Sequence, residues 1–326
     1  MLTIIINVLL VAVGLAMLFA GSEFLIRGSV KIAKRMHISQ LVIGLTIVAF
    51  GTSTPELVVS INSALEGQAD ISLGNIIGSN IVNIGLILGL SAAIFPIAVH
   101  IKTIRREIPI MLAVSLIIIP ISLDGTISQI DGAFLVISLI AFIYFSYRQS
   151  KKENTQIPLI IDDNRENSTT SNNLAFTPLI KNILFVIIGI IILYFGSSFT
   201  VDNAVSIANS LGISERIIGL TIIAIGTSLP ELITSVGAAR KKHADLSIGN
   251  IIGSNIFNVL SILGISSLII GIKVNFTIFI DYVVMIGFSA ALIPVMKSGF
   301  IISKKEGYIL VTAYLLYLGF LIVTIY

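Results

Sequence analysis

Two glutamates lie inside strongly apolar stretches of this chain, each at the end of the same short motif. Glu56 ends "GTSTPE" at residues 51–56, and Glu231 ends "GTSLPE" at residues 226–231. A carboxylate at the centre of a membrane span costs about 2.5–3.5 kcal/mol on insertion scales. No lysine or arginine lies deep within the predicted spans to neutralise them. Each glutamate is therefore expected either to be protonated or to hold a cation.

The residues around the glutamates favour the cation. Pro55 has no N–H, so the carbonyl of Gly51 loses its helical partner, and Pro230 does the same to Gly226. Free carbonyls, hydroxyls and carboxylates are the ligands of Ca²⁺, which takes about six to eight oxygens. The chain has no cysteine and only three histidines, near predicted helix ends, which disfavours transition metals. The alternative is a pair of neutral, hydrogen-bonded structural acids. The hydroxyl side chains that share a face with the glutamates are Thr52, Ser53 and Ser60, then Thr227, Ser228 and Ser235.

A second motif follows each of the first. "DISLGNIIGSNIVNIGLILG" at residues 70–89 returns as "DLSIGNIIGSNIFNVLSILG" at residues 245–264. Its amides are predicted either to coordinate a cation and orient the carboxylates or to form plain interhelical hydrogen bonds. The two G-x-x-x-G pairs predict close helix packing, and Asp70 and Asp245 are predicted N-caps. One polar face holds Asn75, Ser79 and Asn83, with Asn80 beside them, and the other holds Asn250, Ser254 and Asn258, with Asn255 beside them.

The composition requires a membrane protein. Hydrophobic residues make up 56% of the 326 residues and charged residues 11%, against about 25% charged in soluble domains. A span needs about 20 apolar residues, and the N-terminal stretch is interpreted as a first span rather than a signal peptide. The predicted spans are 3–26, 40–65, 71–95, 105–123, 130–147, 179–201, 214–239, 246–271, 278–296 and 306–325.

The basic residues orient these ten spans. With both termini outside, 18 of the 20 lysines and arginines fall in inside loops, and only Arg216 and Lys273 lie outside. The linker between spans five and six is then cytoplasmic.

The chain is also an internal duplication. An offset of 175 residues aligns residues 38–89 with 213–264 without a gap, with 31 identities in 52 positions. Five spans per copy is an odd number, so the copies have inverted topology, as in many secondary transporters. The predicted fold is an all-α integral membrane protein with two inverted-topology five-helix repeats. Residues 1–147 form the first repeat, 148–178 a flexible linker and 179–326 the second repeat, with the repeated cores at 38–89 and 213–264.

The doubled GTS-x-PE and G-N-x-x-G-S-N-x-x-N motifs resemble those of the calcium/cation antiporter superfamily over essentially the whole chain. The Thr-Ser pair is similar to the sodium/calcium exchanger branch, whereas the proton/calcium branch carries Asn-Ala. Some relatives have Asp where this chain has Asn258, which argues against K⁺ co-transport and leaves the stoichiometry open. The resemblance implies central ligands at Glu56 and Glu231, with Thr52, Ser53, Thr227, Ser228, Ser79, Ser254, Asn83, Asn258 and the carbonyls of Ala49 and Ala224.

The expected function is Ca²⁺/Na⁺ antiport by alternating access, in which spans one and six slide as the gate. The alternative is Ca²⁺/H⁺ antiport through the same glutamates. An ion channel, a passive receptor and an intramembrane protease fit less well, the last because the spans hold no Asp pair or Ser–His dyad. No enzyme activity, cofactor or nucleic acid is expected. The expected partners are the lipid bilayer, here a prokaryotic plasma membrane judging by chain length, together with Ca²⁺ and Na⁺ or H⁺; the oligomeric state stays open.

Overall fold

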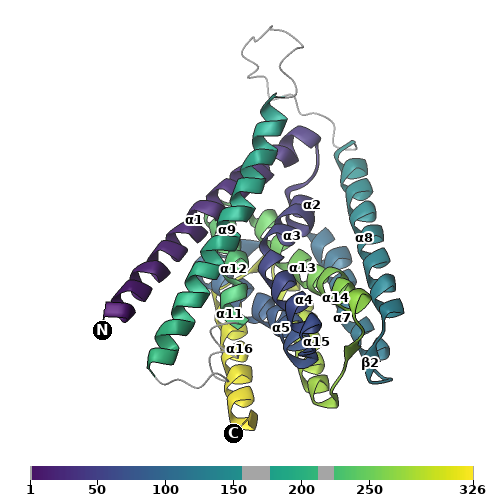
Figure 1. The fold of residues 1–326 in the computed structure, drawn as a ribbon. Helices are drawn as coiled ribbons and strands as arrows, with labels where there is room; N and C mark the ends of the chain where they lie inside the picture. Colours follow the sequence, from purple (N-terminus) through teal and green to yellow (C-terminus); the bar gives the residue numbers. More distant parts are fainter. Residues whose placement is uncertain (1, 156–176, 212–223, 326) are drawn as a thin grey trace.

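The computed structural model describes residues 2–155, 177–211 and 224–325, which fold as a helical membrane protein (Figure 1). The first half comprises α1 (Leu2–Met36), α2 (Gln40–Ile43), the π-helical η1 (Gly44–Val48), α3 (Ala49–Thr52), α4 (Thr54–Leu65), α5 (Ala69–Val82), the π-helical η2 (Asn83–Leu88), α6 (Gly89–Ile94), β1 (Ile97–Ala98), the π-helical η3 (Thr103–Glu107), α7 (Ile108–Ile121), β2 (Thr126–Ile127) and α8 (Gln129–Thr155).

The second half repeats this order. It comprises α9 (Thr177–Ser210), α11 (Ala224–Thr227), α12 (Leu229–Arg240), α13 (Ala244–Phe257), the π-helical η5 (Asn258–Leu263), α14 (Gly264–Ile269), β3 (Ile272–Lys273), the 3₁₀-helical η6 (Phe276–Ile278), α15 (Phe279–Lys297), β4 (Ile301–Ile302) and α16 (Lys304–Ile325). Among the described residues, six helices are long and apolar enough to cross a membrane, and the pair Gln40–Thr52 and Thr54–Leu65, bent by 49°, makes a seventh. The other predicted spans correspond to η3–α7, α11–α12 and α16.

Several sequence-based boundaries are wrong. The first and sixth spans were expected at 3–26 and 179–201, but α1 and α9 continue to Met36 and Ser210. The linker was expected from residue 148, yet α8 extends to Thr155, because "RQSKKEN" is rich in residues with good helix propensity. The rest of the predicted linker up to 176, and the first part of the predicted seventh span, lie outside the described residues.

The predicted N-caps are also wrong. Gln68 and His243 occupy the N-cap positions of α5 and α13, and neither side chain caps its helix. Asp70 and Asp245 lie in the first turn instead, where the helix dipole still favours a negative charge.

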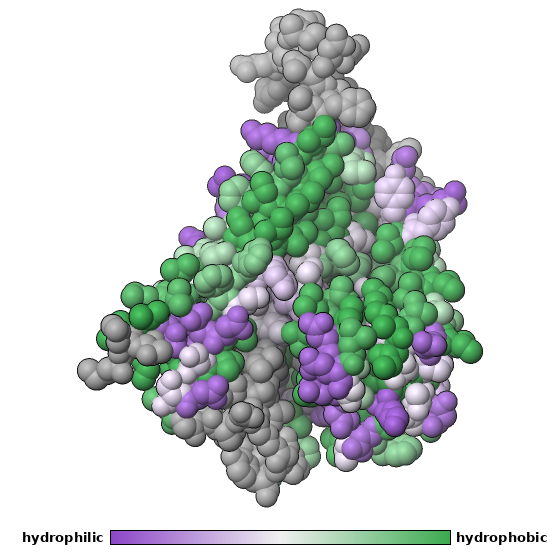
Figure 2. All heavy atoms as spheres, viewed as in Figure 1, coloured by the Kyte–Doolittle hydropathy of each residue, from purple (hydrophilic) through white to green (hydrophobic). Residues whose placement is uncertain are grey.

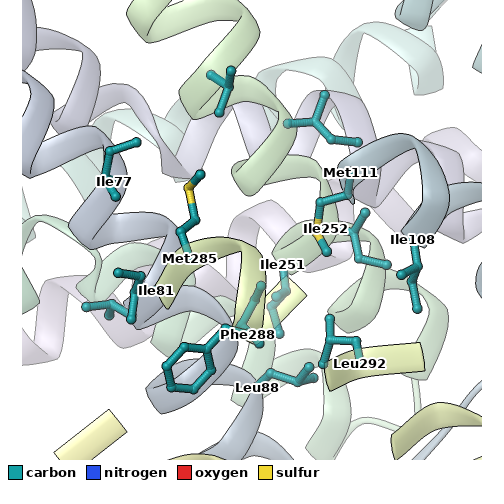
Figure 3. Packing of buried hydrophobic residues seen from close by; sticks show 14 of the residues in the cluster. Ile77, Ile81, Leu88, Ile108, Met111, Ile251, Ile252, Met285, Phe288 and Leu292 are labelled. Atoms are coloured by element: carbon teal, nitrogen blue, oxygen red, sulfur yellow. The ribbon is translucent and has the colours of Figure 1, made fainter. Parts of the chain in front are cut away.

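Two central helical rods form the core: α5–η2–α6 (Ala69–Ile94) and α13–η5–α14 (Ala244–Ile269). In the most apolar stretch of each helix, the buried share is 83% in Ala69–Ile94 and 89% in Ala244–Ile269, against 22% in α1 and 28% in α9. Figure 3 shows isoleucines of α5 and α13 packed with Met285, Phe288 and Leu292 of α15 and with Ile108 and Met111 of α7. The two copies of the second motif, at residues 70–89 and 245–264, therefore lie on the most buried of the long helices that the structure describes.

The helices α1 and α9 pack on each other along one flank of this core (Figure 1). Glycines allow the close approach: a Cβ built on Gly21 would lie 2.9 Å from the carbonyl oxygen of Gly189, and one on Gly189 would lie 2.9 Å from the oxygen of Gly21. Many large apolar side chains of both helices are exposed. Figure 2 shows them as a broad apolar surface, with hydrophilic residues toward the linker end and the opposite end.

The predicted glycine packing in the second motif depends on the copy. A Cβ on Gly249 would lie 2.5 Å from the oxygen of Leu41, and one on Gly253 would lie 2.7 Å from Cα of Leu45, so packing of α13 on α2 and η1 is confirmed. For Gly74 and Gly78 no described atom lies within 4 Å of such a Cβ.

Short strand pairs at the two ends of the molecule display the inverted repeat. Ile97 of β1 pairs with Ile302 of β4, and Ile127 of β2 pairs with Ile272 of β3. The offset of 175 residues converts the first pair into the second. The ends of α1 and α16 near the chain termini lie opposite the ends of α8 and α9 that flank the linker (Figure 1). This is the arrangement of two inverted five-helix repeats.

Candidate ion-binding site

Each GTS-x-PE motif breaks its helix at the serine. Ser53 has φ −80° and ψ 10° between α3 and α4, and Ser228 has φ −87° and ψ 9° between α11 and α12. A proline follows in the first turn of each new helix, where its missing N–H removes no hydrogen bond within that new helix. Glu56 and Glu231 consequently lie in the first turn of α4 and α12. The positive end of the helix dipole points toward them and stabilises a negative charge there.

The two breaks face each other and exchange hydrogen bonds. Ser53 Oγ donates to Glu231 Oε1 at 2.8 Å, and Ser228 Oγ donates to Glu56 Oε1 at 2.9 Å. Both glutamates are buried, with 1% of their surface exposed. The offset that relates the repeats converts one bond into the other. The two carboxylates therefore belong to one site on the pseudo-two-fold axis, and each repeat supplies a hydroxyl to the carboxylate of the other.

The second motifs bring their serines to the same place. Ser254 Oγ donates to Glu231 Oε1 at 3.4 Å, and Ser79 Oγ lies 3.4 Å from Ser228 Oγ, which can accept its hydrogen. Asn83 and Asn258 follow Ser79 and Ser254 by four residues, which is one helical turn along the same face. Both begin a π-helical segment, η2 and η5, of the kind that is frequent at functional sites.

Several buried oxygens of these residues have no hydrogen-bond partner among the described residues. They include Oε2 of Glu56 and of Glu231 and Oδ1 of Asn83 and of Asn258. A buried acceptor without a partner costs about 1–3 kcal/mol, and more when it is charged. All four atoms only accept, unless a carboxyl is protonated, so a cation would satisfy them together. The described residues hold no group of three or more His, Cys, Asp and Glu side chains, so the remaining ligands would be neutral oxygens.

A layer of amides holds the broken helices against the central rods. Asn75 Nδ2 donates to Ser60 Oγ at 2.8 Å, and Asn250 Nδ2 donates to Ser235 Oγ at 2.9 Å. Thr52 Oγ1 donates to Asn250 Oδ1 at 3.1 Å. These contacts give Asn75 and Asn250 a positioning role one turn beyond the glutamates.

The remaining predicted ligands lie on α3 and α11, the short helices directly before the two breaks. The carbonyl of Ala49 accepts the Ser53 N–H at 3.0 Å and lies 3.3 Å from Thr52 Oγ1. Thr227 is buried at the end of α11. Ala224 begins α11, directly after residues 212–223, which lie outside the described part of the chain.

Comparisons with known proteins identify the family. The family model described as sodium/calcium exchanger protein matches residues 6–148 and again residues 181–323. Sodium/calcium exchanger MaX1 of Methanosarcina acetivorans is 31% identical over 351 residues, covering 99% of each chain. Inner membrane protein YrbG of Escherichia coli (strain K12) is 39% identical over 267 residues, covering 80% of this chain and 79% of that protein.

A solved structure has the same fold. The sodium-calcium exchanger NCX_Mj, soaked with 10 mM Na⁺ and zero Ca²⁺, superimposes with a TM-score of 0.82 at 32% identity, covering 97% of this chain and 99% of that one. This chain belongs to the sodium/calcium exchanger family. It is a membrane transporter and not an enzyme. The two family matches are themselves offset by 175 residues, which is the offset of the internal repeat.

Sequence reasoning about this exchanger missed two features of the site. It did not predict the π-helical segments that begin at Asn83 and Asn258, although glycine or serine residues within and after them weaken regular helix. It also treated Asn80 and Asn255 as equivalent neighbours of the site. The structure gives them different hydrogen bonds, and no signal in the motif itself distinguishes them.

Proposed function

We propose that this exchanger carries Ca²⁺ in one direction and Na⁺ in the other by alternating access. Both ions occupy the site around Glu56 and Glu231 in turn. The reciprocal bonds from Ser53 to Glu231 and from Ser228 to Glu56 carry the proposal, because they unite the two repeats at one buried dicarboxylate. The proposed ligand set is Glu56, Glu231, Thr52, Ser53, Thr227, Ser228, Ser79, Ser254, Asn83, Asn258 and the carbonyls of Ala49 and Ala224.

The charge of the site accounts for exchange. Two carboxylates are balanced by one Ca²⁺ or by two Na⁺. Without a cation, two negative charges remain buried, and burying an uncompensated charge is costly. The ion-free protein is therefore expected to resist the change between its outward-open and inward-open states, whereas the ion-bound protein undergoes this change. This coupling produces antiport rather than leak and requires no cofactor.

Na⁺ is favoured over H⁺ as the driving ion. The hydroxyl oxygens of Thr52, Ser53, Thr227 and Ser228 are hard neutral ligands suited to Na⁺, and these side chains are buried. MaX1 and NCX_Mj are named as sodium/calcium exchangers. In the alternative, Ca²⁺/H⁺ antiport, the same glutamates would carry protons.

The rest of the molecule fits this mechanism. We assign the helices up to α8 to the first repeat and those from α9 onward to the second, and we place the linker between α8 and α9 in the cytoplasm, on the basis of the basic residues. The pair α1 and α9 is much less buried than the two central helical rods and packs along one flank of the core. We expect this pair to move against the core as the gate.

The test is ⁴⁵Ca²⁺ uptake into proteoliposomes loaded with Na⁺ and diluted into Na⁺-free buffer, compared with liposomes that carry only a pH gradient. Uptake driven by Na⁺ alone supports the proposal, and uptake driven only by the pH gradient establishes the alternative. The Glu56→Gln variant is expected to abolish exchange, while Glu66→Gln, an exposed glutamate at the end of the same helix, is expected to retain it. Normal exchange by Glu56→Gln would overturn the site assignment.

A further inference from the structure

Asn80 and Asn255 occupy the same position in the two copies of G-S-N-x-x-N, but they make different contacts. Asn255 Nδ2 donates to the carbonyl of Ile251 in its own helix at 2.8 Å. Asn80 Nδ2 instead crosses to the other repeat and donates to the carbonyl of Asn255 at 3.3 Å. Both asparagines are at most 2% exposed, so neither exchanges these bonds for bonds to bulk water. The pseudo-two-fold symmetry of the site is broken at this pair.

Asn80 also receives a bond from the ion site. Asn258 Nδ2 donates to Asn80 Oδ1 at 3.0 Å. A primary amide has its N–H groups on one side and its oxygen on the other, so this bond fixes which way the amide of Asn258 faces. Its Oδ1 is turned away from Asn80 and has no hydrogen-bond partner among the described residues. Asn80 thus keeps the oxygen of Asn258, and not its NH₂ group, available to a cation.

The other copy lacks the equivalent bond. Symmetry would have Asn83 donate to Oδ1 of Asn255, yet that oxygen has no hydrogen-bond partner in the described part of the chain. The amide of Asn83 is therefore not held by Asn255 in the way that Asn258 is held by Asn80.

Asn80 also contacts a residue outside the repeated motifs. The second N–H of Asn80 is directed at Met285 Sδ, 3.4 Å away on α15. Figure 3 shows Met285 between Ile77 and Ile81 of α5 and Ile251 of α13. The residue equivalent to Met285 in the first repeat is Met111, since Ser115 and Pro120 of α7 match Ser289 and Pro294 of α15 at an offset of 174 residues. Thioether sulfur is a weak acceptor, and both repeats have this methionine, so the difference between the copies lies in the orientation of the two amides themselves.

We propose that Asn80 is a positioning residue that sets the Ca²⁺ affinity of the exchanger by holding the amide of Asn258, and that its counterpart Asn255 has no such role. This inference rests on the proposed function, since it takes the site around Glu56 and Glu231 to bind Ca²⁺. It adds that only one of the two ligand amides is held in place by a neighbouring asparagine, a difference that the near-identical motifs do not indicate.

The matched pair Asn80→Ala and Asn255→Ala tests the inference by equilibrium ⁴⁵Ca²⁺ binding to the purified protein and by uptake in proteoliposomes. Loss of one neutral hydrogen bond, worth about 1 kcal/mol, corresponds to a dissociation constant raised about five-fold in Asn80→Ala. The Ca²⁺ dissociation constant of Asn255→Ala is expected to stay within about two-fold of the wild-type value. The maximal exchange rate and the thermal unfolding midpoint of Asn80→Ala should change little, which separates positioning from a general loss of structure.

A double-mutant cycle shows whether Asn80 acts through Asn258. In an Asn258→Ala background there is no amide to hold, so adding Asn80→Ala should weaken Ca²⁺ binding no further. Equal effects of Asn80→Ala and Asn255→Ala, or an undiminished effect of Asn80→Ala in the Asn258→Ala background, would overturn the inference. A wild-type protein that binds Ca²⁺ without exchanging it would refute the proposed function alone, because the binding comparison still decides the role of Asn80. A wild type that binds no Ca²⁺ would refute both.

Discussion

At the scale of single residues, the site depends on hydroxyls that serve the opposite repeat. Ser53 and Ser228 were expected to share a face with the glutamate of their own helix, three residues ahead. Because each helix breaks at the serine itself, the hydroxyl turns toward the other repeat and donates to its carboxylate. Each carboxylate therefore depends on both copies of the motif, although the sequence places all the required groups within six residues.

Ser53→Ala and Ser228→Ala should each weaken Ca²⁺ binding. A hydrogen bond to a charged group contributes about 1.5–3 kcal/mol, which corresponds to roughly a ten- to hundred-fold higher dissociation constant. The two effects should be similar, because the bonds are related by the repeat. ⁴⁵Ca²⁺ binding to the purified variants measures them, with Ser138→Ala as the control, since that partly exposed serine donates to the carbonyl of Phe134 in its own helix α8. Variants of Ser53 or Ser228 that bind like the control would contradict the described geometry.

At the scale of helices, the contrast is between an enclosed core and a peripheral pair. The rods Ala69–Ile94 and Ala244–Ile269 are mostly buried and carry the polar motifs, whereas α1 and α9 face lipid over most of their length. In lipid, apolar surface does not drive helices together, so close packing at small residues has to hold α1 and α9 together. Their glycines provide it.

Gly21→Val should therefore destabilise the pair. A Cβ at this position lies 2.9 Å from backbone atoms of α9, so the helices would have to separate. Overpacking of this kind typically costs about 1–3 kcal/mol. Thermal unfolding in detergent is expected to show a lower midpoint for Gly21→Val. Gly319→Val on α16, where no described atom lies within 4 Å of a built Cβ, is the matched substitution and should leave the midpoint close to wild type. An equal shift in both variants would refute the role of glycine packing.

At the scale of the whole molecule, charge and not the inverted repeat is expected to determine the orientation in the membrane. The strand pairs β1–β4 and β2–β3 join the repeats at opposite ends, so the two membrane faces are structurally similar. What distinguishes the faces is charge, because nearly all the basic residues gather at the linker end. We accordingly expect the loop after α7 to be outside and the start of α16 to be cytoplasmic.

Cysteine labelling in intact cells checks this orientation, and the absence of native cysteine provides a clean background. Leu123→Cys, exposed after α7, should react with a membrane-impermeant maleimide. Lys305→Cys, exposed at the start of α16, should react only after the cells are permeabilised. The reverse pattern would show that the protein is inserted the other way round.

The sequence by itself determined the class of the fold, the duplication and the chemistry of the candidate site. These follow from local patterns: apolar runs long enough to span a bilayer, an offset of 175 residues, and carboxylates with hydroxyl neighbours. The sequence predicted the ends of the helices less well, because α1, α8 and α9 extend into polar residues that hydropathy assigns to loops.

Only the tertiary structure decided which groups meet. Ser53 bonds Glu231 and not Glu56, and Asn80 holds Asn258 while Asn255 bonds its own helix. These choices depend on contacts between segments about half the chain apart. Two identical motifs cannot specify different roles for their own residues. The difference arises in the contacts of the folded molecule, where Asn80 crosses to the carbonyl of Asn255 while Asn255 donates to the carbonyl of Ile251 in its own helix.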